Sequence, residues 1–207
     1  MNIQSAYNLW SEEYDSNPNK TRDLDQRATI ETLKRFDFST VLELGCGTGK
    51  NTSYLLSKAA RIIGLDFSEK MLEKAKEKIS DKRVTFKMAD LTKVWEIEND
   101  FADLITSSLT LEHIENLDHI FSQAYQKLKT NGLFFICELH PFKQYSGSKA
   151  KFDTEGGTVE LEVYIHHITD YLDNAKTNGF QLVELKEWFD ENDENGLPRL
   201  ISFVFRK

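Results

Sequence analysis

Three glycines at alternating positions, Gly45, Gly47 and Gly49, directly follow a short apolar run. Glycine lacks a Cβ atom and tolerates positive φ, so the backbone amides of such a turn can approach a ligand closely. One acidic residue, Glu43, lies two positions before the first glycine, and another, Asp66, ends the next apolar run. This combination predicts a site for a nucleotide-like ligand that carries positive charge.

Three classes of cofactor use glycine-rich turns, and the neighbouring residues separate them. A P-loop requires G-x-x-x-x-G-K-[ST], but Leu44 and Asn51 stand where a glycine and a serine or threonine are needed. A dinucleotide site prefers G-x-G-x-x-G, and Lys50 occupies the position of its third glycine. Glu43 would also repel a pyrophosphate. An NAD-dependent oxidoreductase therefore ranks third among the functions that we consider. The acid-flanked turn favours a cationic cofactor.

The segment E-L-G-C-G-T-G matches [DE]-x-G-x-G-x-G, and here the chain resembles the class I S-adenosylmethionine-dependent methyltransferases. Their cofactor carries a sulfonium and an ammonium group and no phosphate, which suits an acid-flanked turn. Three further segments follow in the family order: R-I-I-G-L-D at residues 61–66, V-T-F-K-M-A-D-L at 84–91, and F-A-D-L-I-T-S-S-L-T-L-E-H-I at 101–114. Together these motifs are far more specific than the glycine turn alone.

The resemblance implies a role for residues in each motif. Asp66 would accept hydrogen bonds from both ribose hydroxyls, each contributing roughly 1.5–3 kcal/mol. Asp90 would accept one from the adenine amino group, and Met88, Ala89 and Leu91 would contact the ring. The complete expected cofactor site consists of Tyr14, Arg22, Glu43, Gly45, Cys46, Gly47, Gly49, Asp66, Phe67, Met71, Ala89, Asp90, Leu91 and Ser107.

The apolar pattern after the first motif alternates between strand and helix, which favours an α/β fold with a mostly parallel sheet. The resemblance implies a Rossmann-like class I methyltransferase fold. Its seven-stranded sheet would have the order 3-2-1-4-5-7-6, with strand 7 antiparallel and helices on both faces. We expect a single methyltransferase domain over residues 1–207.

Individual elements can also be predicted. Apolar residues at helical spacing predict helices at residues 71–79 and 114–128. Asn131-Gly132 and Asn178-Gly179 are predicted to end helices with left-handed caps. The last strand is expected at residues 200–205.

Two regions outside this scaffold are expected to bind the methyl acceptor. Tyr7, Trp10 and Tyr14 fall at helical spacing, and residues 1–36 resemble the lid helices of small-molecule methyltransferases, although such rings also pack helices onto a core. Residues 140–167 begin at the C-terminal end of an expected strand, where open α/β sheets bind ligands. We expect this insertion to form a substrate cap that closes with the lid over the cofactor.

Methyl transfer is an in-line displacement in which positioning alone can supply about 7–11 kcal/mol. A general base helps when the acceptor is a hydroxyl or a protonated amine, and histidine suits this role near neutral pH. His140, at a strand end, is the first candidate and His113 the second, and either could instead be a hydrogen-bonded structural histidine. The spacing of the histidines gives no case for a metal site.

The composition fits one soluble globular domain. The chain has 207 residues, 40% of them hydrophobic, and a formal net charge of −8. That charge argues against a broad nucleic-acid surface, and no stretch approaches the roughly 18 apolar residues of a membrane span. Cys46 and Cys137 give no disulfide framework. We therefore expect a cytoplasmic protein without nucleic-acid or membrane partners; its oligomeric state is not predicted.

The predicted function is transfer of a methyl group from S-adenosyl-L-methionine to a small-molecule acceptor, with S-adenosyl-L-homocysteine as the product. S-S-L-T follows the expected fourth strand, where amino-methylating DNA enzymes carry [DN]-P-P-[YFW]. A protein methyltransferase and a module that binds the cofactor without turnover are the alternatives.

Overall fold

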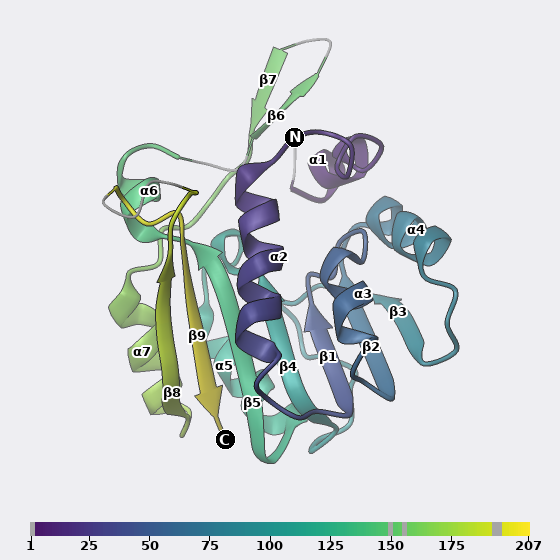
Figure 1. Cartoon of the computed structure of the whole chain (residues 1–207), viewed down its shortest axis with the longest axis vertical. Coiled ribbons are helices and arrows are strands. Elements are labelled where there is room, and N and C mark those ends of the chain that lie inside the picture. The colour runs from purple at the N-terminus through teal and green to yellow at the C-terminus, as the bar shows by residue number, and fades with distance from the viewer. Residues whose placement is uncertain (1–2, 149–150, 155–156, 192–195) are drawn as a thin grey trace.

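In the described part of the chain, seven strands form one mixed sheet with helices on both faces (Figure 1). The computed structural model describes residues 3–148, 151–154, 157–191 and 196–207. The strands of this sheet are β1 (Thr40–Leu44), β2 (Arg61–Asp66), β3 (Val84–Met88), β4 (Ala102–Ser108), β5 (Leu128–Leu139), β8 (Gln181–Trp188) and β9 (Leu200–Arg206). They lie in the order β3-β2-β1-β4-β5-β9-β8, with β9 antiparallel to both neighbours. Because β8 and β9 are the sixth and seventh strands of the sheet, the predicted order and fold class are confirmed.

Two pairs of helices cover the faces of the sheet (Figure 1). α2 (Lys20–Leu33) and α3 (Lys50–Leu55) pack on one face. α5 (Leu117–Lys127) and α7 (Ile168–Thr177) pack on the other, around a cluster of aromatic rings centred on Phe121. The other helical segments are α1 (Ile3–Trp10), α4 (Glu69–Lys78), a 3-10 turn (Leu111–His113) and α6 (Pro141–Tyr145). Within the described ranges, every helix is too short or too polar to span a bilayer.

The carboxyl ends of the central parallel strands meet at one edge of the sheet. Leu44 of β1 pairs with Leu65 of β2 and with Ser107 of β4, so these three strands end at the same level. β1 is buried almost throughout, as expected for a central strand of a parallel sheet. Gly45 and Asp66 are therefore brought side by side at this edge.

The N-terminal helix and a small hairpin lie beyond the same edge (Figure 1). β6 (Lys151–Thr154) and β7 (Gly157–Glu160) form this separate antiparallel hairpin. Ala6 of α1 is fully buried and forms a small apolar cluster with Leu161, against which Tyr7 packs. α1 thus contacts the chain that follows β7.

The predicted helix caps had different outcomes. α5 ends before the expected cap, and β5 already pairs with β4 from Leu128 onward. Asn131, with φ of 66°, therefore lies inside β5, where a register shift accommodates it, and its predicted role as a helix cap is wrong. Gly179, with φ of 88°, directly follows Asn178 at the end of α7, which confirms the second cap.

Candidate functional site

The glycine turn connects β1 to α3, and its glycines have φ of 64° at Gly45, 51° at Gly47 and 79° at Gly49. A Cβ atom on Gly45 would lie 2.1 Å from Oγ1 of Thr110, which follows β4. A Cβ atom on Gly47 would meet nothing within 4 Å. The first glycine therefore permits close packing of two strand ends, and the second leaves space for a ligand.

Asp66 fixes the conformation of this turn from the end of β2. Its Oδ2 accepts a hydrogen bond from the amide of Gly47 at 2.9 Å, and its Oδ1 accepts one from the amide of Ser68 at 2.8 Å. Burial raises the pKa of Asp66 to about 6, although these two bonds lower it. A carboxylate has about four lone-pair positions, so Asp66 retains acceptor capacity for hydroxyl groups of a ligand.

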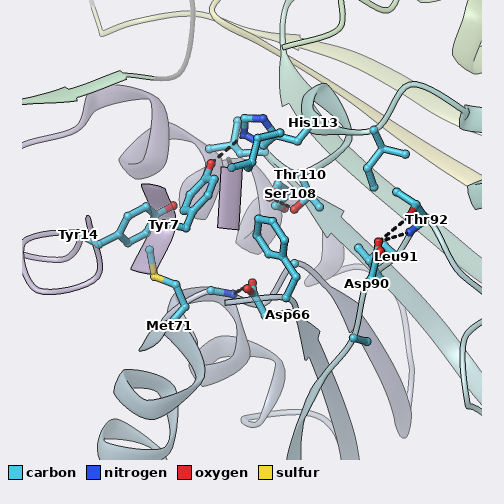
Figure 2. Close-up of a pocket in the computed structure, with 17 residues that line it drawn as sticks. Tyr7, Tyr14, Asp66, Met71, Asp90, Leu91, Thr92, Ser108, Thr110 and His113 are labelled. Atoms are coloured by element: carbon cyan, nitrogen blue, oxygen red, sulfur yellow. Dashed lines mark hydrogen bonds between the residues drawn. The ribbon is translucent and has the colours of Figure 1, made fainter. Parts of the chain in front are cut away.

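A first cavity of about 270 Å³ lies between α1, the glycine turn and the ends of β2 and β4. Figure 2 shows Asp66 and Met71 on one side of it and Asp90 and Leu91 on another. Met88, which was expected to contact a bound ring, is 66% exposed and lies outside the lining. The predicted residues that line the cavity are Tyr14, Gly45, Gly47, Asp66, Phe67, Met71, Ala89, Asp90, Leu91 and His113.

A second, smaller cavity of about 50 Å³ lies behind the glycine turn and is rich in charge. Arg22 and Lys50 line it together with the carboxylates of Asp25 and Glu43. Glu43 accepts a hydrogen bond from the Thr52 hydroxyl at 2.5 Å, and burial raises the pKa of Glu43 to about 8. The predicted residues in this lining are Tyr14, Arg22, Glu43, Gly45, Cys46 and Gly47.

A third cavity of about 420 Å³ lies between the N-terminal segment and the chain after β5. Tyr7, Trp10 and Tyr14 form one wall, and Glu112, Glu160 and Arg199 contribute charged groups. The remaining lining residues are Asn19, Thr21, Arg22, Leu109, Leu139, Ser146, Gly147 and Ser148.

The three cavities meet at two residues, Tyr14 and Leu109, which line all of them. Leu109 has φ of 51°, a conformation that costs an L residue about 1–2 kcal/mol. Such backbone strain clusters at functional sites. The junction therefore joins a nucleotide-sized cavity, a charged cavity and an aromatic cavity at the end of β4.

Comparison with known proteins identifies this arrangement. A family model described as a methyltransferase domain matches residues 42–136. The solved structure of a proposed S-adenosylmethionine-dependent methyltransferase from Listeria monocytogenes is 25% identical, with a TM-score of 0.76 over 90% of this chain and 99% of that chain. Residues 42–136 therefore match a methyltransferase domain, and the fold around them is that of the class I S-adenosylmethionine-dependent methyltransferases. The cofactor predicted from the sequence is the one that gives this family its name.

Curated relatives of this methyltransferase differ in their acceptors. Phosphoethanolamine N-methyltransferase 1 from Triticum aestivum is 28% identical over 89% of this chain, and malonyl-[acyl-carrier protein] O-methyltransferase from Bacillus cytotoxicus is 31% identical over 65% of it. The chain spans less than half of either relative, 43% and 48% of their lengths. An N-methyltransferase and an O-methyltransferase are thus about equally similar.

In this methyltransferase the candidate base His113 contacts the N-terminal helix. Its Nδ1 lies 3.1 Å from the carbonyl oxygen of Glu162, so Nδ1 carries the hydrogen and donates it. Its Nε2 lies 2.8 Å from the hydroxyl oxygen of Tyr7 (Figure 2). Because this nitrogen carries no hydrogen, it can accept the hydrogen bond of the Tyr7 hydroxyl. Burial lowers the pKa of His113, against the raising effect of the Glu162 carbonyl, and favours the neutral imidazole. Tyr7 itself lines both the first and the third cavity.

The structure does not place His140, the other candidate base, at any of the three cavities. Its side chain is fully buried, with Nδ1 accepting from the amide of Phe142 at 3.2 Å and Nε2 lying 3.1 Å from a carboxylate oxygen of Glu187. Pro141 begins α6 directly after it, so His140 is the N-cap of that helix. Both ring nitrogens are used structurally, and the expectation of a catalytic His140 is corrected.

Two predicted cofactor residues, Gly49 and Ser107, also line none of these cavities. Gly49 is the N-cap of α3, and a Cβ atom there would lie 2.9 Å from Ile79 Cδ1. Ser107 is fully buried, whereas its neighbours Thr106 and Ser108 line the second cavity. Successive side chains of a strand point to opposite faces, so Ser107 faces away from the ligand side.

The lining residues that sequence reasoning missed include Leu109, Thr110 and Glu112. All three follow β4, one of the strands whose C-terminal ends form this edge. The rule that ligands bind beyond the carboxyl ends of parallel strands could have indicated them. Within the residues that are described, no group of three or more His, Cys, Asp or Glu side chains is arranged to hold a metal ion.

Proposed function

We propose that this methyltransferase transfers a methyl group to a small molecule bound in the third cavity. The observation that carries the proposal is that this cavity meets the first and second cavities at Tyr14 and Leu109. Residues 1–36 would act as the lid and residues 140–167 as the substrate cap, since α1 contacts Leu161. A volume of about 420 Å³ suits a metabolite-sized acceptor.

The residues present fit S-adenosylmethionine, which supplies an electrophilic methyl carbon on a sulfonium. In the first cavity, apolar groups such as Phe67 and Leu91 would contact the adenine, and Asp66 would accept from the ribose hydroxyls. In the second cavity, Glu43 suits an ammonium group, whose charge would favour the ionised form of this buried carboxyl, and Arg22 suits a carboxylate. The open space beyond Gly47 leaves room for the ligand backbone between them.

We assign His113 as the general base, acting through Tyr7. The hydroxyl of Tyr7 donates to His113 Nε2 at 2.8 Å, while the same residue borders the cofactor and acceptor cavities. The Tyr7 oxygen would accept the acceptor proton as its own proton passes to the imidazole. Burial raises the pKa of Tyr7 well above its usual value, which favours movement of both protons in one step.

Calorimetric titration with S-adenosylmethionine tests the cofactor site. Asp66→Ala is expected to abolish binding, because two charge-assisted hydrogen bonds contribute about 3–6 kcal/mol together. Asp173→Ala, on the exposed face of α7, is the matched control and should bind like the unsubstituted protein. Folded, ligand-free protein that does not bind the cofactor would refute the assignment of this site.

A screen for formation of S-adenosylhomocysteine tests the acceptor and the base. Small-molecule pools, peptide pools and carrier-protein thioesters are supplied in parallel. Turnover only with small molecules supports the proposal, turnover only with peptides or carrier proteins contradicts it, and tight cofactor binding without any turnover favours a binding module. With the identified acceptor, His113→Gln and Tyr7→Phe should each lower kcat by about 10²–10⁴-fold, a larger effect than any loss of cofactor affinity from these two residues of the first cavity.

A further inference from the structure

We infer that the methyl acceptor is a small amine, bound in the third cavity as an ammonium ion with Glu112 as its counter-ion. This inference rests on the proposed function and specifies the chemical class of its substrate. It depends on a buried carboxylate, on the charge balance of the cavity and on the aromatic wall opposite.

Glu112 lies in the 3-10 turn after β4 and lines the third cavity with only 7% of its surface exposed. One carboxylate oxygen accepts a hydrogen bond from the neutral amide of Gln144 at 3.4 Å, and the other lies 4.0 Å from Nε2 of His113. Among the described residues, no lysine or arginine forms an ion pair with Glu112. Burial raises the pKa of Glu112 to about 7, so a bound cation would relieve the cost of its ionised form.

The other charged groups of the cavity leave this negative charge uncompensated. Arg199 binds Asp190 through two nitrogens, at 2.5 and 2.6 Å, and is thereby neutralised. Arg22 donates to the carbonyl oxygen of Asn17 at 2.6 Å and also lines the second cavity, where it suits the cofactor carboxylate. The balance favours a cationic acceptor over an anionic one.

The wall of the cavity is also suited to a cation. The rings of Tyr7, Trp10 and Tyr14 are neighbours, with centroid separations of 5.8 Å, 6.5 Å and 4.9 Å. The guanidinium of Arg22 already lies over the Tyr14 ring, 5.2 Å from its centre, and an ammonium group over the face of Tyr7 or Trp10 would be attracted in the same way. A neutral alcohol would gain neither this contact nor the pairing with Glu112.

The chemistry balances with the groups present. The bound ammonium releases one proton to the Tyr7 oxygen as the Tyr7 proton passes to Nε2 of His113. The freed nitrogen lone pair forms the bond to the methyl carbon, and the carbon–sulfur bond breaks with its electron pair remaining on sulfur. The products are a methylated ammonium, a neutral thioether and a protonated His113, which returns its proton to water.

Binding of two matched probes tests the inference. Phenethylammonium and 2-phenylethanol have nearly the same shape and differ in charge, and both are titrated into the protein saturated with S-adenosylhomocysteine. An ion-paired hydrogen bond contributes roughly 1.5–3 kcal/mol, so the ammonium should bind at least about tenfold more tightly than the alcohol. Glu112→Gln should remove most of this preference. Glu115→Gln, an exposed residue in the same segment, should retain it.

The outcomes separate this inference from the proposed function. Absence of S-adenosylhomocysteine binding to the folded protein would contradict the proposed function itself. If the product binds but the ammonium probe binds no better than the alcohol, the amine assignment alone is overturned. A charge preference that survives in Glu112→Gln, with S-adenosylhomocysteine affinity unchanged, overturns the role of Glu112. If Glu112→Gln fails to fold, Glu112→Asp, which withdraws the carboxylate, should reduce the preference in the same direction.

Discussion

Replacement of Gly45 by alanine isolates the physical requirement of the glycine turn. Gly45 has φ of 64°, and an alanine Cβ atom there would lie 2.1 Å from Oγ1 and 2.7 Å from Cγ2 of Thr110. Gly47 provides the matched control, because its φ of 51° carries a similar backbone penalty while its Cβ atom would meet nothing within 4 Å. The two substitutions therefore differ in the clash but share the strain.

The expected magnitudes follow from these two terms. An L residue in the left-handed region costs about 1–2 kcal/mol, and overpacking typically costs about 1–3 kcal/mol. Gly45→Ala should therefore lower the free energy of unfolding by about 2–5 kcal/mol, and Gly47→Ala by only the backbone part. Gly47→Ala should nevertheless weaken cofactor binding, because its methyl group would project into the space that the first two cavities share.

Urea unfolding at 25 °C measures the free energy of unfolding of both variants. Repeating the Gly45→Ala substitution in a protein that also carries Thr110→Ala tests whether the clash with Thr110 causes the loss. Thr110→Ala removes the two atoms closest to the introduced methyl group. In that background, Gly45→Ala should cost less than in the unsubstituted protein, by up to about 3 kcal/mol, because only the Cβ atom of residue 110 remains within 3 Å, at 2.9 Å. An equal cost in both backgrounds, or a cost for Gly45→Ala no larger than for Gly47→Ala, would refute the clash as the reason for a glycine at this position.

Three further substitutions have expected outcomes. Burial raises the folded-state pKa of Glu43 to about 8 from an ordinary 4.5, so its protonated form stabilises the fold below pH 4.5 and this contribution is lost as the pH rises through 8. Urea unfolding between pH 5 and 8 should show stability falling less steeply in Glu43→Gln, and equal slopes would contradict the shift. His140→Ala should lower the free energy of unfolding by about 1–3 kcal/mol and leave the calorimetric affinity for S-adenosylhomocysteine unchanged. Weakened affinity would show that His140 contributes to ligand binding. Ser107→Ala removes a buried hydroxyl that has no hydrogen-bond partner, so stability should stay equal or rise by about 1 kcal/mol with the same affinity; a loss of affinity would show that Ser107 contacts the ligand.

The parts of the site that sequence predicts well are those fixed by local chemistry. Gly45 and Asp66 follow directly from a strand end, a turn that needs positive φ and an acid within hydrogen-bonding reach of that turn. The sheet order followed from the family resemblance that these motifs established. Ser107 was placed wrongly because neighbouring residues of a strand face opposite sides, so a one-residue error changes the face completely.

The parts that sequence does not predict depend on distant segments. His140 directly follows β5, which favours a ligand contact, but Pro141 begins a helix at once and turns the imidazole towards Phe142 and Glu187. Glu112 lines the third cavity together with Tyr7, Trp10 and Glu160, which come from segments far from it in the sequence. No spacing in the sequence encodes that meeting of segments.

The attachment of α1 has a consequence for the timing of each catalytic cycle. This eight-residue helix buries only Ala6, and polar bonds hold it to the loop after β2, from Gln4 to the carbonyl oxygen of Phe67 and from the Ser68 hydroxyl to Asn8. Tyr7 adds its hydrogen bond to His113 and its ring contacts with His113 and Phe67. A helix of about two turns attached by these few contacts opens more often than the sheet unfolds. Since Ile3 and Tyr7 form part of the first cavity, we expect product to leave when the helix lifts. The residence time of S-adenosylhomocysteine on the enzyme would then be set by the opening rate of α1. A substitution that shortens this residence time should also speed amide hydrogen exchange along α1.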